Sequence, residues 1–149
     1  DEETKRHYQT TLEKFVHTGT LAERDAKRGV ILREIMKDNR NKVVAITPMA
    51  YAEHFMPLLE SEEVFAIELR DTPENIFARL VFSDENDIIY RDDAYKEAHK
   101  NHYLEEIYED IGYYGQYSFG KIKNKFDMCG DVPEVVVEKM IEKYALTEN

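Results

Sequence analysis

Two histidines and a glutamate lie at a spacing that could bind a metal ion. His99, His102 and Glu106 occupy positions i, i+3 and i+7 of a predicted helix, which places their side chains on one face. Two imidazoles and one carboxylate on a single metal ion would support a metal-dependent hydrolase. No fourth ligand can be identified in the sequence, so a solvent-exposed helix face is the favoured interpretation.

The segment GQYSFGKI, from Gly115 to Ile122, is a near match to the phosphate-binding motif GxxxxGK[ST]. Such a loop must follow a strand and open a helix, because backbone amides at the helix N-terminus then surround the phosphates. Here Ile122 occupies the position where Ser or Thr would hold Mg²⁺, and the segment follows a predicted helix and precedes a predicted strand. We therefore interpret it as a glycine-containing connection.

The charge balance excludes one large class of partners. The 149 residues include 20 Lys plus Arg against 31 Asp plus Glu, which gives a formal net charge of −11. Nucleic-acid binding requires a basic surface, and this sequence contains no basic stripe. No apolar run approaches the roughly 20 residues that span a bilayer, and DEETKRH has no apolar core typical of a signal peptide. These features predict a soluble, cytoplasmic protein without a membrane partner.

The elements that must position any site follow an α/β pattern. The apolar runs at 42–46 and 64–69 are predicted strands separated by a helical stretch, as a parallel sheet buried on both faces requires. A third strand is expected at 125–129, where Cys129 is predicted to be a buried thiol. Helices are predicted at 2–8, after a Thr10–Glu13 capping box, after a Thr20–Glu23 capping box up to 39–41, and at 51–59, 74–82, 94–114 and 133–146.

Four segments carry a resemblance to a known family. They are DEETKR at the start, AERDAK around Arg24, VFAIELRDTPENIFARL from Val64, and MCGDVPEVVVEKMIEKY from Met128. Their order and motifs resemble the shikimate kinase family, which consists of small phosphotransferases of the P-loop kinase class. The resemblance covers nearly the whole chain in element order.

The resemblance implies a fold and a set of site residues. The fold would be a three-layer α/β/α domain with a parallel sheet spanning residues 1–149, with a lid at about 83–96. Asp1 would orient a substrate hydroxyl and could accept its proton, Arg24 would bind the carboxylate of a small acid such as shikimate, and Arg91 would stabilise the transferred phosphoryl group. The family's ATP contacts fall on Asp131, Val132 and Pro133, and Mg²⁺ would accompany ATP. The family's first strand, phosphate loop and first helix are expected upstream of Asp1.

Two departures from the family pattern keep a second function open. Thr47, Pro48 and Met49 replace three glycines, and Pro48 has no amide hydrogen to donate to a substrate. Asp110 replaces an arginine, and its negative charge would repel an acidic substrate. The chain is therefore predicted to be either a shikimate kinase-like phosphotransferase or a noncatalytic, degenerate kinase fold that acts as a binding or interaction module.

Overall fold

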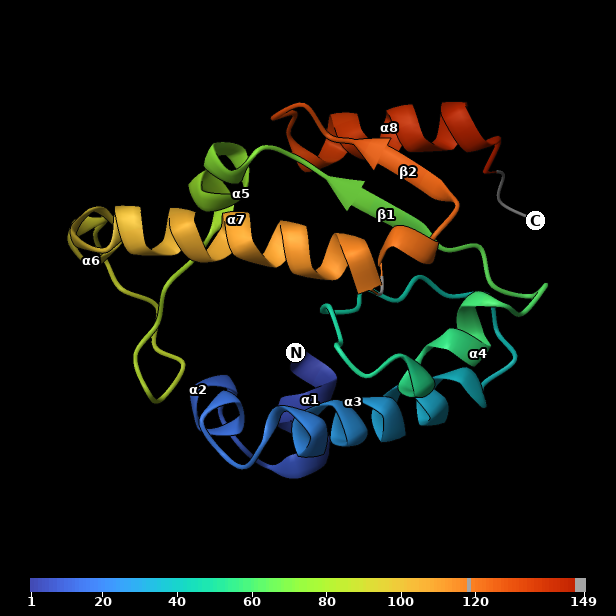
Figure 1. The fold of residues 1–149 in the computed structure, drawn as a ribbon, viewed down its shortest axis with the longest axis horizontal. Coiled ribbons are helices and arrows are strands. Elements are labelled where there is room, and N and C mark those ends of the chain that lie inside the picture. The colour runs from blue at the N-terminus through green and yellow to red at the C-terminus, as the bar shows by residue number, and fades with distance from the viewer. Residues whose placement is uncertain (118, 147–149) are drawn as a thin grey trace.

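The computed structural model describes residues 1–117 and 119–146, which form helices and one pair of strands (Figure 1). In chain order the elements are α1 (Glu2–Tyr8), α2 (Leu12–Val16), α3 (Leu21–Met36), η1 (Ala52–His54), α4 (Met56–Leu59), β1 (Ile67–Arg70), α5 (Pro73–Arg79), α6 (Ala94–Ala98), α7 (Lys100–Tyr117), η2 (Phe119–Lys121), β2 (Asn124–Asp127) and α8 (Pro133–Tyr144). The predicted α/β class is confirmed in this coarse form. None of the helices in the described part of the chain is long and apolar enough to cross a membrane.

The two strands are parallel, as predicted for the sheet, and they correspond with shifted bounds to the predicted strands at 64–69 and 125–129. Ile67 lies opposite Asn124 and Arg70 lies opposite Asp127, so the carboxyl ends of β1 and β2 meet at the same edge. The closing helix α8 packs on this pair, because the Tyr144 hydroxyl donates a hydrogen bond of 2.9 Å to the backbone oxygen of Lys125. Figure 1 shows α8 running alongside β2.

The predicted strand at 42–46 is wrong, because these residues form an irregular segment. The Lys42 ammonium donates to the backbone oxygen of Ile35 at 2.7 Å and also to that of Asp38, so the segment starts against the end of α3. Val43 is fully exposed, and Val44 packs against the buried cluster of Leu32, Met49 and Phe55. The run therefore contributes to a local core instead of adding a strand to the sheet.

Local start signals predicted most helices correctly. The helix at 2–8 is confirmed as α1, and Thr20 forms the expected capping box at the start of α3. The Thr72 side chain accepts from the Asn75 amide, with Pro73 at the first position of α5. Several bounds differ. The cap of α2 is Thr11 instead of Thr10, and α3, α5 and α8 end earlier than expected, at Met36, Arg79 and Tyr144. The helix expected at 51–59 is divided into η1 and α4, and the one expected at 94–114 divides at His99 into α6 and α7, which continues to Tyr117.

Two smaller predictions can be compared with the structure near β2. Cys129 is exposed, so the prediction of a buried thiol is wrong; it lies in the turn after β2 with a positive φ of 54°. In the Gly115 to Ile122 segment, the described residues form the end of α7 and η2, and β2 follows. A Cβ on Gly120 would lie 2.3 Å from the Gly115 backbone oxygen, so this turn needs glycine. The segment thus precedes a strand, as a phosphate loop does not.

The loop expected to act as a lid, at about 83–96, is docked on the N-terminal helices. The Leu12 amide donates to the Asp87 carboxylate at 3.1 Å, and the Thr11 hydroxyl donates to the Glu85 backbone oxygen at 3.0 Å. The Lys5 ammonium lies 3.6 Å from Asp87. We call these five residues the clasp. Within the described ranges, all side-chain hydrogen bonds and ion pairs between residues 1–60 and 64–146 belong to it.

Candidate functional site

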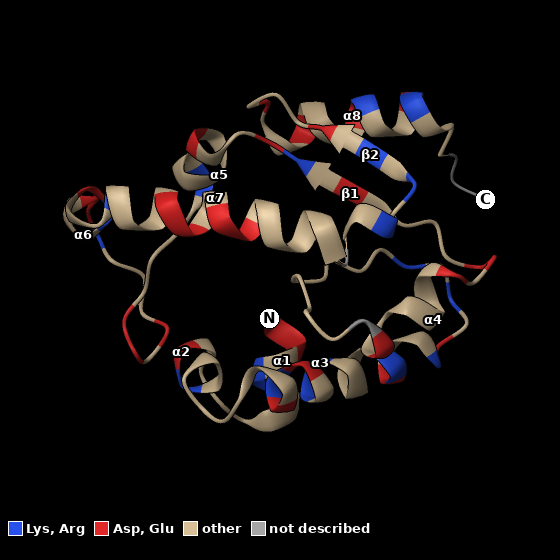
Figure 2. Ribbon diagram, viewed as in Figure 1, with Lys and Arg blue, Asp and Glu red and all other residues tan. Residues whose placement is uncertain are grey.

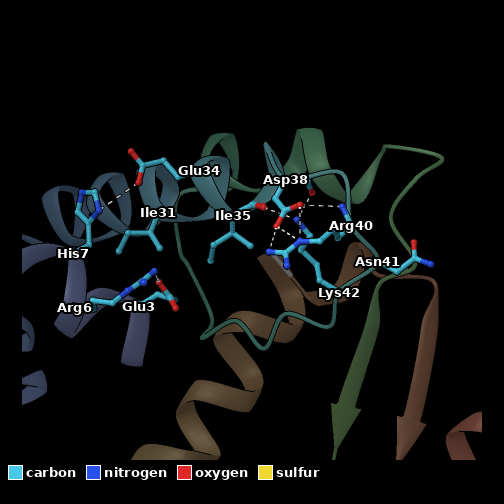
Figure 3. A pocket seen from close by; sticks show the side chains of 10 residues that line it. All are labelled: Glu3, Arg6, His7, Ile31, Glu34, Ile35, Asp38, Arg40, Asn41 and Lys42. Carbon is cyan, nitrogen blue, oxygen red and sulfur yellow. Dashed lines mark hydrogen bonds and ion pairs between the residues drawn. The ribbon is translucent and has the colours of Figure 1, made fainter. Parts of the chain in front are cut away.

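Two hollows lie beside α1 and α3, and the larger one has a volume of about 660 Å³ (Figure 3). Its charged side chains are already paired with one another: Arg6 with Glu3, His7 with Glu34 at 3.3 Å, and Arg40 with Asp38 at 2.6 Å. A ligand would have to displace these pairs, which are exposed to solvent. The larger hollow is therefore a weaker candidate for a specific site.

The smaller hollow, of about 430 Å³, lies between α1, α3 and the irregular segment after α3. We call it the α1–α3 pocket. Its charged lining consists of the acidic residues Asp1, Glu2 and Glu3 and the basic residues Arg28 and Lys42. Apolar walls come from Leu32 and Met49, and Thr47 lines it from the segment. Three positions that the resemblance singled out, Asp1, Thr47 and Met49, therefore line the same hollow.

Arg28 supplies positive charge to this pocket together with Lys42, whose ammonium is already bonded to the backbone oxygens of Ile35 and Asp38. Its side chain is 17% exposed, and it lies over the Phe15 ring with the guanidinium carbon 5.3 Å from the ring centroid. One of its N–H groups donates to Asp25 at 3.3 Å. A guanidinium carries five N–H donors, and this is the one hydrogen bond that the described residues give it, so donors remain for an anionic ligand.

Asp25 is fully buried beneath Arg28. One carboxylate oxygen, Oδ1, accepts from Arg28, while the other, Oδ2, accepts from the backbone amides of Ala50 at 2.8 Å and Tyr51 at 3.2 Å. A buried carboxylate is tolerated only when it is paired and hydrogen-bonded in this way. Asp25 therefore connects α3 to the irregular segment that forms the opposite wall of the pocket.

Sequence reasoning missed both of these residues. It selected Arg24, which lies one helical turn before Arg28 on α3. A signal was present, because Asp25 and Arg28 share a helix face with Leu21 and Leu32 at spacings of three and four residues. Charged residues within an apolar stripe indicate a buried or half-buried polar site.

The other predicted site residues lie outside the pocket. Arg24 donates from Nη1 to the Gly19 backbone oxygen at 2.9 Å and does not line the pocket. Arg91 is exposed in the loop before α6. Residues 131–133 form the start of α8, where Asp131 accepts from the Lys139 ammonium at 2.5 Å. Of the positions predicted to bind or react, the structure places only Asp1 at the α1–α3 pocket within its described residues.

Asp110, which the resemblance aligned with an arginine, belongs to an acidic stretch in the middle of α7 (Figure 2). Desolvation raises the pKa of Asp110, and the neighbouring carboxylates Glu106 and Glu109 raise it further. Burial also raises the pKa of the Tyr114 hydroxyl, with added contributions from Asp110 and Asp25. Tyr114 of α7 therefore lies close enough to Asp25 to be influenced by its charge.

A second buried carboxylate lies where the two strands end. The Asp71 side chain is 1% exposed and accepts hydrogen bonds from the Asn75 side chain at 2.7 Å and from the Gly130 amide at 3.1 Å, while Arg79 forms an ion pair with it at 2.7 Å. Burial alone would raise its pKa, but these bonds and that of the Thr72 amide lower the pKa to about 2. Asp71 is fully paired, so it joins β1 to the turn after β2.

The histidine pair of α6 and α7 does not form a metal site. His99 Nδ1 lies 2.8 Å from the Tyr95 backbone oxygen, and its ring stacks on Tyr95 with centroids 4.1 Å apart. His102 pairs instead with Glu106 at 3.4 Å. Across residues 1–117 and 119–146, no group of three or more His, Cys, Asp or Glu is arranged to hold a metal ion. The hydrolase hypothesis therefore has no support from this geometry.

Comparison of the chain with protein-family models, with curated proteins and with solved structures gave no match.

Proposed function

We propose that this chain is part of a shikimate kinase-like phosphotransferase and that its α1–α3 pocket binds a small hydroxy acid. One observation carries the proposal: a carboxylate from Asp1 and a half-buried guanidinium from Arg28 line the same hollow of about 430 Å³. A carboxylate accepts hydrogen bonds from hydroxyl groups, and a guanidinium binds a carboxylate through two parallel N–H donors. This pair suits a ligand that carries both groups.

The residue roles follow from this placement. Asp1 orients the hydroxyl that receives the phosphoryl group, and Arg28, instead of Arg24, binds the acid. Arg91 on the lid and residues 131–133 near the adenine keep the roles that the family resemblance gives them. The parallel β1–β2 pair would be part of the sheet in a three-layer α/β/α domain.

Phosphoryl transfer itself needs a loop of backbone amides around ATP and a hydroxyl ligand for Mg²⁺. The near match at Gly115 to Ile122 cannot provide it, because it ends in Ile122 and leads into a strand. The proposal therefore assigns substrate binding to the α1–α3 pocket and adenine contacts to residues 131–133, and it does not place the phosphate loop at 115–122.

A noncatalytic binding module is the second candidate, and a specific observation favours it. Thr47 lines the pocket and Pro48 follows it, at positions where the shikimate kinase family has glycines. Pro48 has no amide hydrogen to donate to a substrate. Such a protein would bind the acid without transferring a phosphoryl group.

Calorimetric titration with shikimate tests the binding proposal. The variant Arg28→Met removes the guanidinium and keeps an unbranched side chain close to the length of the aliphatic stem. We expect it to weaken binding at least tenfold, since hydrogen bonds to charged groups contribute about 1.5–3 kcal/mol. Arg24→Met is the matched control on the same helix and should change affinity less than twofold. No binding by the unaltered chain, or an equal loss in both variants, would contradict the proposal.

Phosphorus NMR separates the two candidates. The natural polypeptide is incubated with ATP, Mg²⁺ and shikimate. A new phosphomonoester signal supports the phosphotransferase, while shikimate binding without such a signal supports the binding module.

A further inference from the structure

We infer that Asp25 is a positioning residue that holds Arg28 and the opposite wall of the α1–α3 pocket in the geometry that binds the acid. The inference deepens the proposed function and rests on it, because it concerns the same pocket. Neither composition nor the family resemblance assigns Asp25 a role.

The two oxygens of Asp25 serve two different walls. Oδ1 accepts from Arg28 at 3.3 Å, which directs the guanidinium from within α3. Oδ2 accepts from Ala50 at 2.8 Å and from Tyr51 at 3.2 Å, which fixes the end of the segment that carries Thr47 and Met49. One side chain with no exposed surface therefore sets the position of both walls.

The surrounding packing makes this connection rigid. Met49 is 3% exposed and packs with Leu32 of α3 and with Phe55, so the segment is fixed by apolar contact directly beside the hydrogen bonds. Arg28 is confined on its other side by the Phe15 ring. A binding group held by both packing and a buried hydrogen bond loses little freedom when its ligand arrives.

The substitution Asp25→Asn separates the two functions of this carboxylate. The amide oxygen of asparagine can still accept from Ala50 and Tyr51. Its NH₂ group then faces the Arg28 guanidinium, and two donors cannot bond to each other. The segment should stay in place while Arg28 is released.

A matched control exists at the other buried carboxylate. Asp71→Asn makes the same chemical change in a side chain that is also buried, paired with an arginine and bonded to backbone amides, at the far end of the strand pair. Both variants should lower thermal stability. A purely structural role for Asp25 would leave shikimate affinity equal in the two variants when measured well below their unfolding temperatures.

The experiment combines shikimate calorimetry with NMR of the arginine side chains. We expect Asp25→Asn to bind shikimate about tenfold more weakly and to show a more mobile Arg28 side chain, while Asp71→Asn matches the unaltered chain in both measurements. Wild-type affinity in Asp25→Asn, or an unchanged Arg28 signal, would overturn the inference and leave the proposed function intact.

Failure of the proposed function gives a different result. In that case the unaltered chain binds no shikimate, and the Arg28 mobility in the ligand-free variants still decides whether Asp25 positions it. A further variant, Asp25→Ala, removes both sets of hydrogen bonds. It should also shift the amide resonances of Ala50 and Tyr51, which Asp25→Asn should largely preserve.

Discussion

The clasp between the loop 83–90 and the N-terminal helices can be tested at its hydrogen bond from the Leu12 amide to Asp87. The Leu12 amide is at the first position of α2, where no carbonyl of the helix can accept from it. The Asp87 carboxylate accepts from this amide, while the N-cap Thr11 accepts from the Lys14 amide. We predict that Asp87→Gly releases this contact. Glycine is the appropriate replacement because Asp87 has a φ of 61°, which most side chains adopt only with strain.

The expected magnitude follows from the hydrogen bond that is lost. Removal of a side chain that caps a helix N-terminus costs about 1 kcal/mol. Local opening at Leu12 should therefore become easier by about 1 kcal/mol, which corresponds to roughly fivefold faster exchange of its amide hydrogen.

Amide hydrogen exchange measured residue by residue is the assay. The Tyr90 amide donates to the Phe82 backbone oxygen at 3.0 Å inside the loop, so it reports whether the loop keeps its own structure and should change less than twofold. Glu85→Gln is the matched control. It removes a negative charge from the same loop, but Glu85 contributes only its backbone oxygen to the clasp. If the Leu12 amide exchanged at the same rate in Asp87→Gly and in the unaltered chain, the result would refute the hydrogen bond between Leu12 and Asp87.

Three further predictions concern stability, each measured by chemical or acid unfolding. The folded-state pKa of Asp71 is lowered to about 2, so its contribution to stability should be complete above about pH 4 and lost as the pH falls toward 2. Asp71→Asn should remove this pH dependence of stability, and an acid-unfolding profile that the substitution leaves unchanged would contradict the prediction. Gly29→Ala should destabilise the fold by about 1–3 kcal/mol, since the new Cβ would lie 2.8 Å from His54 Cβ; a gain in stability would show that α3 and η1 are not so closely packed. Thr20→Ala should cost about 1 kcal/mol by removing the α3 cap, and no loss would argue against the capping box.

Local sequence rules explain which elements could be predicted. Thr72 and Pro73 start α5 because a side-chain acceptor and a fixed φ act within one turn of the chain. The strand predicted at 42–46 was wrong because a strand depends on contacts with distant residues. A strand needs a partner, and apolar composition alone does not reveal whether a neighbouring strand is available or whether Val44 will instead pack on Leu32 and Met49.

The site was only partly predictable for a related reason. Asp1 was selected through the resemblance of DEETKR to a kinase segment, and the structure places it in the lining of a pocket. The orientation of Arg28 depends on its hydrogen bond to Asp25. Asp25 is held in turn by the backbone amides of Ala50 and Tyr51, which lie 25 and 26 residues further along the chain. Helix periodicity marks the face of α3 that carries these residues, but it cannot identify the segment that folds against that face.

The most direct measurement of the central claim is an NMR titration of the isotope-labelled chain with shikimate. If the acid binds between Asp1 and Arg28, the shifted resonances should centre on the Arg28 side chain and on the amides of Thr47 and Met49. Shifts that centre instead on Arg6, Arg40 and the larger hollow, or no saturable shifts at all, would contradict the account.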